Sequence, residues 1–345
     1  MHSLNSRSRR AAWTSLALAG TLGLIPVTQA HAADSAPKPK AKTPVQTYGQ
    51  LHVCGTKLCS QSNKPVQLRG MSTHGTQWYP QCLTAAALDA QAYDWKASVL
   101  RVSTYAREGA YLKDPKKYTE LASRLVDMAS ARGMYVIVDW HTIHPGDPHQ
   151  DLDNARAFFK QIAERHKNKK NVIYEIANEP NGVSWATIKD YSEKIIPVIR
   201  SRAPESVVLV PTRGWATLGL AEASKEQEIV DAPVRAKNVM YTYHFYATAG
   251  KEQFLKRLDR ASDKLPIFVS EWAVASWNGW GLDFAMAQKF TDLMAKKKIG
   301  WTNWSLSDNH KDISVFKKGA CSAGKFTGTA PLTANGVWVR QKTRG

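Results

Sequence analysis

The sequence is poor in cysteine and in acidic residues, and it has no long apolar segment. Its four cysteines have spacings that fit no zinc motif, which disfavours a metal site. The longest apolar run, residues 16–27, is about 12 residues long and cannot cross a bilayer core of roughly 30 Å. No glycine-rich loop follows an early predicted strand, so a nucleotide-binding sheet is disfavoured. We therefore expect no metal, no cofactor and no membrane anchor.

Acidic side chains are scarce relative to basic ones, with 29 Asp and Glu against 47 Lys and Arg and a formal charge of +18. Such an excess raises the question of nucleic acid binding. The basic residues, however, are spread along the chain without forming a basic helix, and the aromatic residues cluster with Glu, Asn and His. We therefore expect no nucleic-acid partner, but a solvated basic surface suited to anionic wall polymers.

The first 32 residues have the features of a secretory signal peptide. Three arginines precede the apolar run, and the small-residue motif AHA ends at Ala32. Cleavage there would remove those arginines and no acid, leaving +15 of the +18 charge. Residues 33–46 are rich in Pro and Lys and are expected to form a disordered basic tail. Residues 47–345 are then one large domain of a secreted, extracellular protein.

Short apolar or β-branched segments that end in polar or aromatic residues recur about every 30 residues and predict eight strands. They cover residues 66–74, 99–103, 135–141, 171–179, 207–212, 239–246, 266–272 and 300–306. Helical spacing of apolar residues separates several of them. Four helices are predicted in this way. Their spaced residues are Leu121, Leu125 and Met128, followed by a stop at Gly133; Leu152, Ala155, Phe159 and Ile162; Ile188, Tyr191, Ile195 and Ile199, with Ser184 as N-cap; and Phe284, Gln288, Leu293 and Met294.

Strict alternation of strand and helix predicts parallel strands joined by right-handed crossovers. Eight such units close into a (β/α)8 barrel of ordinary size, the α/β TIM-barrel class. A doubly wound open sheet is the competing topology, but it would need the phosphate loop that the chain lacks. Residues 51–70 are typical of a small β-hairpin that leads into the first strand and covers the bottom of the barrel.

The cysteine pairing follows from the expected closure, although Cys54, Cys59, Cys82 and Cys321 allow three connectivities. Closure places the first strand beside the eighth, so Cys82 and Cys321, which follow these strands, come near each other. We therefore favour that pair, and Cys54 with Cys59 inside the hairpin. Two disulfides suit an exported protein.

Polar and aromatic side chains gather at the carboxyl ends of the predicted strands, where barrels of this class carry their active sites. Each one alone is more simply explained by packing or solvation, but together they would converge at one mouth. They are His74, Trp78, Tyr79, Arg101, Tyr105, His141, Asn178, Glu179, Trp215, His244, Tyr246, Glu271 and Trp304.

Two acids within this set suggest glycoside hydrolysis, which uses one carboxyl group to protonate the departing oxygen and another to attack the sugar or activate water. Glu179 and Glu271 end the fourth and seventh strands and can face each other across a bound sugar. Because strands hold side chains rigidly, we expect the short separation of roughly 5–5.5 Å that is typical of retaining enzymes.

The segments VIYEIANEP, DWH, HFY, EW and WTNWSL, in this order and spacing, resemble glycoside hydrolase family 5, in particular its bacterial endo-β-1,4-glucanases, or cellulases. YGQLHVCG and VQLRGMSTHGTQWYP extend the resemblance from about Tyr48 to Val339. It implies that Glu179 is the general acid and then the general base, protonated near neutral pH. It implies that Glu271 is the ionised nucleophile, with its pKa lowered by Arg101 and its orientation fixed by Tyr246.

The resemblance also implies roles for the other members of the set. Asn178 would bind the 2-hydroxyl of the sugar being cleaved, His141 and His244 would complete the polar lining, and Trp304 would stack under the same sugar. The cleft would continue to neighbouring sugar units along His74, Trp78, Tyr105 and Trp215. The implied partner is a β-glucan polysaccharide, bound by a monomer that needs no cofactor, and no separate cellulose-binding module is expected.

Three departures from the family pattern bear on substrate preference. Asn309 and His310 follow LSD where a sugar-binding lysine is common, Ala273 and Val274 replace the usual GT, and Pro211 replaces a common glycine. One alternative is therefore the same fold and mechanism acting on mannan, xyloglucan or mixed-linkage glucan. A metal-dependent hydrolase is disfavoured because no His-x-His pair follows the first strand. A sugar-binding barrel without catalysis is disfavoured because both acids are present.

Overall fold

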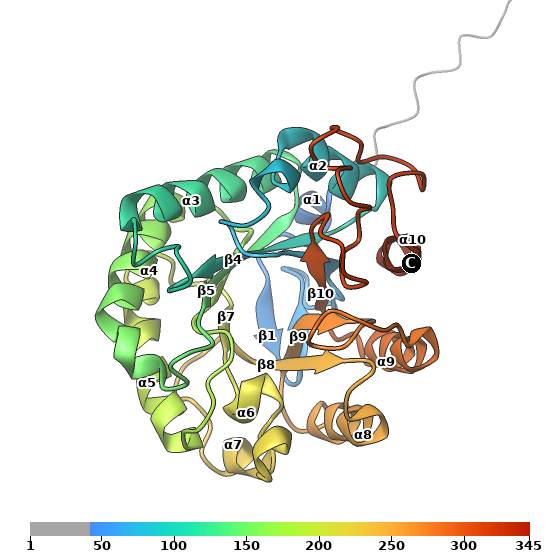
Figure 1. Cartoon of the computed structure of the whole chain (residues 1–345). Coiled ribbons are helices and arrows are strands. Elements are labelled where there is room, and N and C mark those ends of the chain that lie inside the picture. The colour runs from blue at the N-terminus through green and yellow to red at the C-terminus, as the bar shows by residue number, and fades with distance from the viewer. Residues whose placement is uncertain (1–41) are drawn as a thin grey trace, which may run out of the picture. The chain divides into compact units, whose positions relative to one another are not determined.

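The computed structural model describes residues 42–345, which form a closed barrel of eight parallel strands (Figure 1). The order around the barrel is β10-β3-β4-β5-β6-β7-β8-β9, so the first barrel strand pairs with the last. The barrel strands are β3 (Arg69–Thr73), β4 (Val99–Tyr105), β5 (Tyr135–His141), β6 (Val172–Glu175), β7 (Val208–Val210), β8 (Val239–Tyr246), β9 (Ile267–Ala273) and β10 (Trp301–Leu306). The expected (β/α)8 barrel is confirmed.

All eight predicted strands are present, although several are shorter than the segments that predicted them. Residues 171–179 were expected as strand, but β6 ends at Glu175. The residues after it leave the ladder because their side chains turn to partners at the barrel mouth: Asn178 contacts Arg101, and Glu179 contacts His244. The apolar run therefore predicts the strand, and its polar end marks where the chain enters the site.

Helices follow the strands and surround the barrel (Figure 1). The longer ones are α3 (Pro115–Ala131), α4 (Leu152–His166), α5 (Trp185–Arg200), α8 (Lys251–Ala261), α9 (Phe284–Lys297) and α10 (Ala334–Arg344). Shorter helical segments are α1 (Pro44–Tyr48), η1 (Pro80–Cys82), α2 (Ala85–Asp89), η2 (Ala90–Asp94), η3 (Pro148–Asp151), α6 (Arg213–Ala216), η4 (Leu220–Glu222) and α7 (Gln227–Asp231). The predicted N-cap is confirmed, because the Ser184 hydroxyl accepts from the backbone N–H of Thr187 at 3.2 Å.

The bottom of the barrel is an apolar core closed by the N-terminal hairpin. Strands β1 (His52–Cys54) and β2 (Lys57–Cys59) pair antiparallel. Leu51 and Leu58 from this hairpin are buried against a cluster of side chains that includes Ile137, near the beginning of β5, and Phe268, near the beginning of β9. Because this end is filled with apolar side chains, the polar chemistry is confined to the opposite end of the strands.

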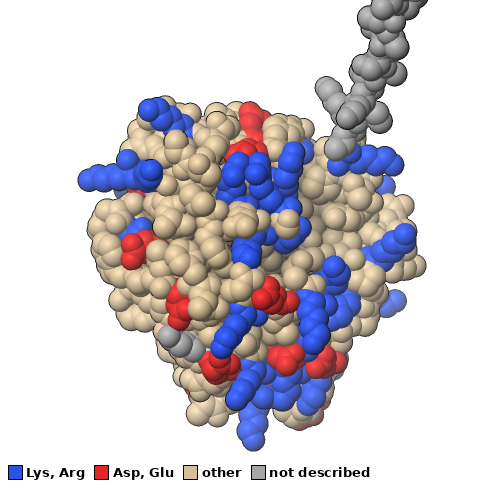
Figure 2. All heavy atoms as spheres, turned by 90° about the vertical axis from the view of Figure 1, so that its right-hand side faces the viewer, with Lys and Arg blue, Asp and Glu red and all other residues tan. Residues whose placement is uncertain are grey.

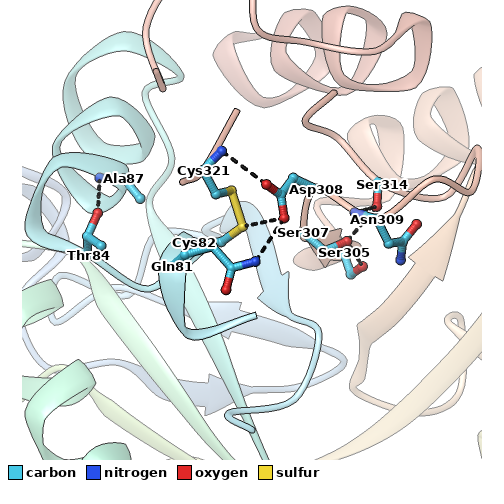
Figure 3. The surroundings of a disulfide bond; sticks show 10 residues. All are labelled: Gln81, Cys82, Thr84, Ala87, Ser305, Ser307, Asp308, Asn309, Ser314 and Cys321. Atoms are coloured by element: carbon cyan, nitrogen blue, oxygen red, sulfur yellow. Dashed lines mark hydrogen bonds between the residues drawn. A yellow bond between two sulfur atoms is a disulfide. The ribbon is translucent and has the colours of Figure 1, made fainter. Parts of the chain in front are cut away.

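Both predicted disulfides are present. Cys54 and Cys59 lie in the hairpin with their Cα atoms 6.0 Å apart, and Cys82 and Cys321 join the loops that follow β3 and β10, with Cα atoms 4.9 Å apart. Figure 3 shows Asp308 beside the second bridge, where it accepts hydrogen bonds from Gln81 Nε2 at 3.1 Å and from the Cys321 backbone N–H at 3.1 Å. The bridge thus fastens the two loops together at the seam where the barrel closes.

The expected signal peptide, residues 1–32, lies outside the described residues, as does most of the expected tail. The tail was expected to extend to residue 46, but its last three residues are helical, because α1 begins at Pro44. Thr43 and Gln46 form a reciprocal capping box that stabilises this short helix. Within residues 42–345, no helix is both long enough and apolar enough to span a membrane.

Charged side chains are distributed over the face on which α8, α9 and α10 lie. Figure 2 shows groups of Lys and Arg there, with fewer Asp and Glu between them and uncharged residues over the rest of the face. Several pairs are ionic: Lys297 lies 2.9 Å from Asp263, and Lys289 lies 2.5 Å from Glu252. The excess positive charge is therefore displayed as a mixed, solvated surface.

Candidate active site

A cavity of about 710 Å³ opens at the carboxyl ends of the barrel strands. Nine of the residues predicted for the site line it: His74, Tyr105, His141, Glu179, Trp215, His244, Tyr246, Glu271 and Trp304. They come from the ends of seven different strands and from the segment after β7, so only the closed barrel brings them together. Arg101 and Asn178 are buried, and Arg101 donates hydrogen bonds to both Glu271 and Asn178.

The two glutamates lie close to each other in this cavity. One carboxylate oxygen of Glu179, one of Glu271 and a ring nitrogen of His244 are all within 4.8 Å of one another. The pairing of β8 with β9 contributes to this, because His244 is directly opposite Glu271 in the ladder. The side chain of Glu179 is 13% exposed and that of Glu271 4% exposed, so the second acid is the more deeply placed.

Hydrogen bonds hold both oxygens of Glu271. Arg101 Nη1 donates to Oε2 at 3.0 Å, and the hydroxyl of Tyr246 donates to Oε1 at 2.5 Å. Burial, together with the neighbouring acids, raises the pKa of Tyr246 well above its ordinary value, so the phenol stays protonated and can donate. Two donors therefore fix the Glu271 carboxyl group in position.

Arg101 lies at the centre of a buried charge network inside the barrel. Its Nε donates to Glu175 Oε2 at 2.7 Å, its Nη2 donates to Asn178 Oδ1 at 2.7 Å, and Nη2 lies 3.0 Å from Asp139 Oδ2. Burial alone would raise the pKa of Glu175, but the Arg101 charge and its hydrogen bonds lower it to about 2. Burial raises the pKa of Asp139 well above its ordinary value. The pKa values of the two acids beside this guanidinium are therefore shifted in opposite directions.

His244 connects the second acid to the same network. Its Nδ1 lies 2.9 Å from Glu179 Oε1, and its Nε2 lies 2.9 Å from the hydroxyl of Ser270, which donates to Glu175 at 2.7 Å. Burial opposes a charge on this imidazole, yet the carboxylates of Glu175 and Glu179 raise its pKa to about 9. A protonated ring donates from both nitrogens, which satisfies both neighbours.

The other two histidines predicted for the site, His141 and His74, are neutral. Burial lowers the pKa of His141 to about 3, and the Arg101 charge acts in the same direction. Its Nδ1 lies 2.7 Å from Asp139 Oδ2, an oxygen that also faces the Arg101 guanidinium at 3.0 Å and therefore acts as an acceptor, so Nδ1 carries the proton and Nε2 is left as an acceptor. Burial likewise lowers the pKa of His74 to about 4, and its Nδ1 lies 2.8 Å from the hydroxyl of Ser305.

Aromatic rings form the walls of the cavity. Trp304 is nearly parallel to His141, at 16° with ring centres 5.5 Å apart, and His141 is 4.0 Å from the Tyr105 ring. Trp215, on the loop after β7, has a left-handed φ of +56° and a backbone N–H that donates to Pro180 at 3.1 Å. Its side chain is 39% exposed at the cavity. These rings offer flat apolar faces beside the acids.

Besides the buried Arg101 and Asn178, two more predicted binding residues are not part of the cavity lining. Trp78 lies against the Tyr105 ring at 4.6 Å and is 43% exposed, and Tyr79 lies 5.1 Å from His74. Both therefore support lining residues from the loop after β3. Lining residues that the sequence did not single out are Ile143, His144, Thr217, Phe245, Ala249, Phe254, Trp277, Asn278, Gly279, Lys311 and Ile313.

Lys311 is relevant to the absence of the common sugar-binding lysine directly after the LSD motif that follows the eighth strand. Asn309 stands where a lysine is common, but Lys311 lines the cavity two residues further on. Its ammonium donates to the backbone carbonyl of Asn278 at 2.9 Å, on the loop after β9. The lysine therefore joins the two loops, a contact that strand spacing could not have indicated.

Glu179, His244 and Glu271 are close enough to be considered as metal ligands, but their chemistry does not fit. Both nitrogens of His244 are within hydrogen-bonding distance of other groups, and its raised pKa of about 9 keeps them protonated. A metal ligand must be the neutral imidazole. A second group of possible ligands consists of Cys82, Asp308 and Cys321. Its two cysteines are joined in a disulfide and offer no thiolate. The geometry instead suits acid–base and nucleophilic chemistry by two carboxyl groups.

Comparison with known proteins agrees with this geometry. The sequence profile of the family described as Cellulase (glycosyl hydrolase family 5) matches residues 59–310. Endoglucanase E-5 of Thermobifida fusca is 52% identical over 310 residues, a match that covers 90% of this chain and 66% of that protein. Endoglucanase CelA of Streptomyces lividans is 46% identical over 300 residues, covering 87% of this chain and 65% of that protein. The chain thus spans less than two thirds of the length of these curated relatives.

Solved structures give the same likeness. The crystal structure of the catalytic domain of Thermobifida fusca endoglucanase Cel5A (E5) superposes with a TM-score of 0.87 at 52% identity, covering 88% of this chain and 100% of that one. A variant of that domain in complex with cellotetraose gives the same TM-score and coverage. The expected resemblance is confirmed at the level of both sequence and fold.

Proposed function

The chain belongs to the cellulase family, glycosyl hydrolase family 5, and we propose that it is an exported endo-1,4-β-glucanase that hydrolyses β-glucans by double displacement. One observation carries the proposal. Oxygens of Glu179 and Glu271 lie within 4.8 Å of each other at a cavity lined with aromatic rings. This separation suits a retaining reaction, because an inverting enzyme needs roughly 6.5–9.5 Å between its carboxyl groups to place a water.

Glu271 is the nucleophile in this proposal. Both of its oxygens accept hydrogen bonds, from Arg101 and from Tyr246, which favours the ionised form and fixes its direction of attack. It attacks the anomeric carbon of the bound sugar, and the bond from that carbon to the leaving-group oxygen breaks. A covalent glycosyl-enzyme ester is formed, and its carbonyl oxygen keeps the donor that stabilised the carboxylate.

Glu179 is the general acid and then the general base. In the first step it gives its proton to the departing glycosidic oxygen, and in the second it takes a proton from the water that attacks the ester. The more exposed position of Glu179 suits this exchange with water. His244 lies 2.9 Å from Glu179 Oε1 and keeps the carboxyl group aimed at the cavity.

The remaining residues position the sugar. The amide oxygen of Asn178 accepts from Arg101, and its NH₂ donates one hydrogen to the Thr142 carbonyl at 3.5 Å, which leaves the second hydrogen for the 2-hydroxyl. His141 offers its unprotonated Nε2 as an acceptor, since Nδ1 is paired with Asp139. Trp304 presents its ring as a platform for the same sugar. Hydrogen bonds to the 2-hydroxyl strengthen as positive charge develops on the ring, which lowers the barrier.

Export and substrate complete the proposal. A signal peptide over residues 1–32 and two disulfides suit an extracellular enzyme that acts as a monomer. A β-1,4-glucan is favoured over mannan, xyloglucan and mixed-linkage glucan because a relative of 52% identity binds cellotetraose. That choice remains a proposal, since residues around the cleft decide the sugar while the two acids are shared.

The test combines a substrate panel with the stereochemistry of the product. The purified protein is assayed on carboxymethyl cellulose, lichenan, mannan and xylan, with reducing ends as the readout. We expect the fastest hydrolysis on carboxymethyl cellulose. Proton NMR of the first product from a cello-oligosaccharide should show the β-anomer before mutarotation. An α-anomer appearing first would refute double displacement, and preference for mannan would refute the proposed substrate.

A further inference from the structure

Two tryptophans are displayed to solvent on one loop beside the active-site cavity. The loop after β9, residues 274–283, is called the rim loop below. Trp277 is 75% exposed and Trp280 is 46% exposed, the two highest values among the exposed tryptophans of residues 42–345. Large indoles normally bury most of their surface, so a pair left in water by the fold is unusual. Neither belongs to the proposed catalytic machinery.

The rim loop holds these rings in a defined position. Within it, the Ser276 N–H donates to the Trp280 carbonyl at 3.2 Å, and the Gly279 N–H donates to the Ser276 carbonyl at 2.9 Å. The Trp280 N–H donates to the side-chain oxygen of Asn278 at 3.1 Å. Gly279 has a φ of +91°, a conformation in which a side chain would be strained. The turn is therefore preorganised.

A second loop fastens the rim loop from outside. In the segment after β10, the Ile313 N–H donates to the Gly279 carbonyl at 3.1 Å, and Asp312 accepts from the Gly281 N–H at 2.8 Å. Lys311 donates to the Asn278 carbonyl at 2.9 Å. The segment is fixed in turn near the disulfide, where Asn309 donates to Ser314 at 3.1 Å (Figure 3). Rigid display lowers the entropic cost of binding a ligand on the tryptophans.

The rim loop reaches the catalytic cavity. Trp277, Asn278 and Gly279 line the same cavity as the two glutamates. Trp280 lies three residues further along the loop, outside the cavity lining, with its ring centre 5.5 Å from that of His310, which is exposed on the neighbouring loop. A ligand that leaves the cavity over the β9 loop therefore passes Trp277, and Trp280 is the next exposed ring on that loop.

We propose that the rim loop forms an outer binding site in which Trp277, extended by Trp280, stacks on a distal glucose unit of a long glucan chain. This inference rests on the proposed function. Trp277 lines the cavity that holds the two acids, and a polymer of flat sugars can occupy that cavity and reach the exposed indoles as well. A protein partner would need a standard interface of about 800 Å² on each side, for which two rings at a cavity edge are a poor match.

The test compares a long and a short substrate in the same protein. The value of kcat/KM is measured for cellohexaose and for p-nitrophenyl β-cellobioside, which carries only two glucose units. Trp277→Ala should lower the ratio of the long to the short value roughly three- to tenfold, as expected for loss of one stacking contact. The double variant Trp277→Ala with Trp280→Ala should lower it further. Trp277→Phe keeps a flat ring and should recover most of the loss.

Tyr93→Ala is the matched control, because Tyr93 is 56% exposed on η2 and does not line the cavity. It should leave the ratio of the two values unchanged. A wild-type ratio in the double variant would overturn the outer site, as would an equal loss in the Tyr93 variant. If wild-type protein hydrolyses neither substrate, the proposed function fails. The outer site is then tested separately by measuring the affinities for cellohexaose and cellotriose with calorimetry. There the double variant should lose affinity for cellohexaose relative to cellotriose, and an unchanged affinity ratio would refute it.

Discussion

Glu175 and Arg101 form a two-point ion pair inside the closed barrel, with Nε 2.7 Å from Oε2 and Nη2 3.2 Å from Oε1. Both side chains are fully buried. The pair fixes the plane of the guanidinium, and Nη1 is thereby directed at Glu271, 3.0 Å away. Glu175 also reaches His244 through the hydroxyl of Ser270. One buried carboxylate thus supports the partners of both proposed catalytic acids.

Glu175→Gln should therefore weaken the fold and change the titration of His244. Removing one member of a buried ion pair costs about 3–5 kcal/mol of unfolding free energy. The pKa of His244 should fall from about 9, because the Glu175 carboxylate helps to keep the imidazole charged against the effect of burial. Urea unfolding measures the first effect, and NMR titration of the imidazole measures the second.

Glu226→Gln is the matched control for this variant. Glu226 is also a buried acid paired with arginine, since it lies 3.0 Å from Arg257, but that pair is outside the cavity lining. The control should lose stability without moving the titration of His244. If the two variants behave alike in both measurements, Glu175 has only a structural role.

Glu179→Gln and Glu271→Gln should each abolish most hydrolysis. General acid–base catalysis contributes roughly 10²–10⁴-fold, and loss of the nucleophile should cost at least as much. Glu179→Gln should fold normally, because its side chain is partly exposed. Glu271→Gln should lose some stability, because Arg101 is left with a neutral partner. Turnover of carboxymethyl cellulose measures activity, with circular dichroism as the check on folding.

Glu120→Gln, an exposed position on α3, serves as the control and should keep wild-type turnover. Turnover within tenfold of wild type in either active-site variant would refute the assignment of that acid. Loss of activity in the control would mean that the assay responds to general handling instead of to the site.

The barrel and the proposed catalytic pair could be predicted from the sequence for a physical reason. Strands buried on both faces are continuous apolar runs, so each barrel strand and its polar end can be recognised in the residue pattern. Glu179 and Glu271 stand at such ends, where the fold class carries its chemistry. The cysteine pair across the seam followed from closure alone.

Glu175 and Asp139 were missed because they lie inside apolar runs, where the pattern indicates core. Their signal was readable, because a charge in a fully buried strand needs a partner. Arg101 could have been proposed for it, since β4 is next to β5, which carries Asp139, and two strands from β6, which carries Glu175. Trp277 and Lys311 had no such signal. Their directions depend on loop hydrogen bonds, which no periodicity encodes.

Removing the disulfide between Cys82 and Cys321 should lower the unfolding free energy more than removing the one in the hairpin. The first closes a loop of 239 residues and the second a loop of 5. Chain entropy alone predicts about 5 kcal/mol for the long loop and about 2 kcal/mol for the short one. The comparison is made by urea unfolding of Cys82→Ala with Cys321→Ala and of Cys54→Ala with Cys59→Ala. Equal losses, or a larger loss in the hairpin, would contradict the entropic account.

The unfolding free energy should be greatest near pH 6.5–7 and fall on both sides. Burial holds the pKa of His141 at about 3, whereas an unfolded histidine titrates near 6.5. Between these values the unfolded chain binds a proton that the native state does not, so stability falls as the pH drops, by about 2 kcal/mol at pH 5 for this residue. His244 acts in the opposite direction. Its pKa of about 9 gives a contribution that is complete below pH 6.5 and lost as the pH rises towards 9.

Urea unfolding at intervals between pH 4.5 and 9.5 measures both slopes, and one variant separates the acid slope from the site. Burial also lowers the pKa of His166 to about 4, and this residue is on α4, hydrogen-bonded to Ser123 at 2.8 Å. In His166→Gln the fall between pH 6.5 and 5 should be smaller than in wild type, because one histidine that resists protonation is gone. The alkaline slope should be unchanged, since His244 is intact. A free energy of unfolding that is constant from pH 7 to pH 5 in the wild-type protein would show that these imidazoles gain protons in the folded state as readily as in the unfolded chain.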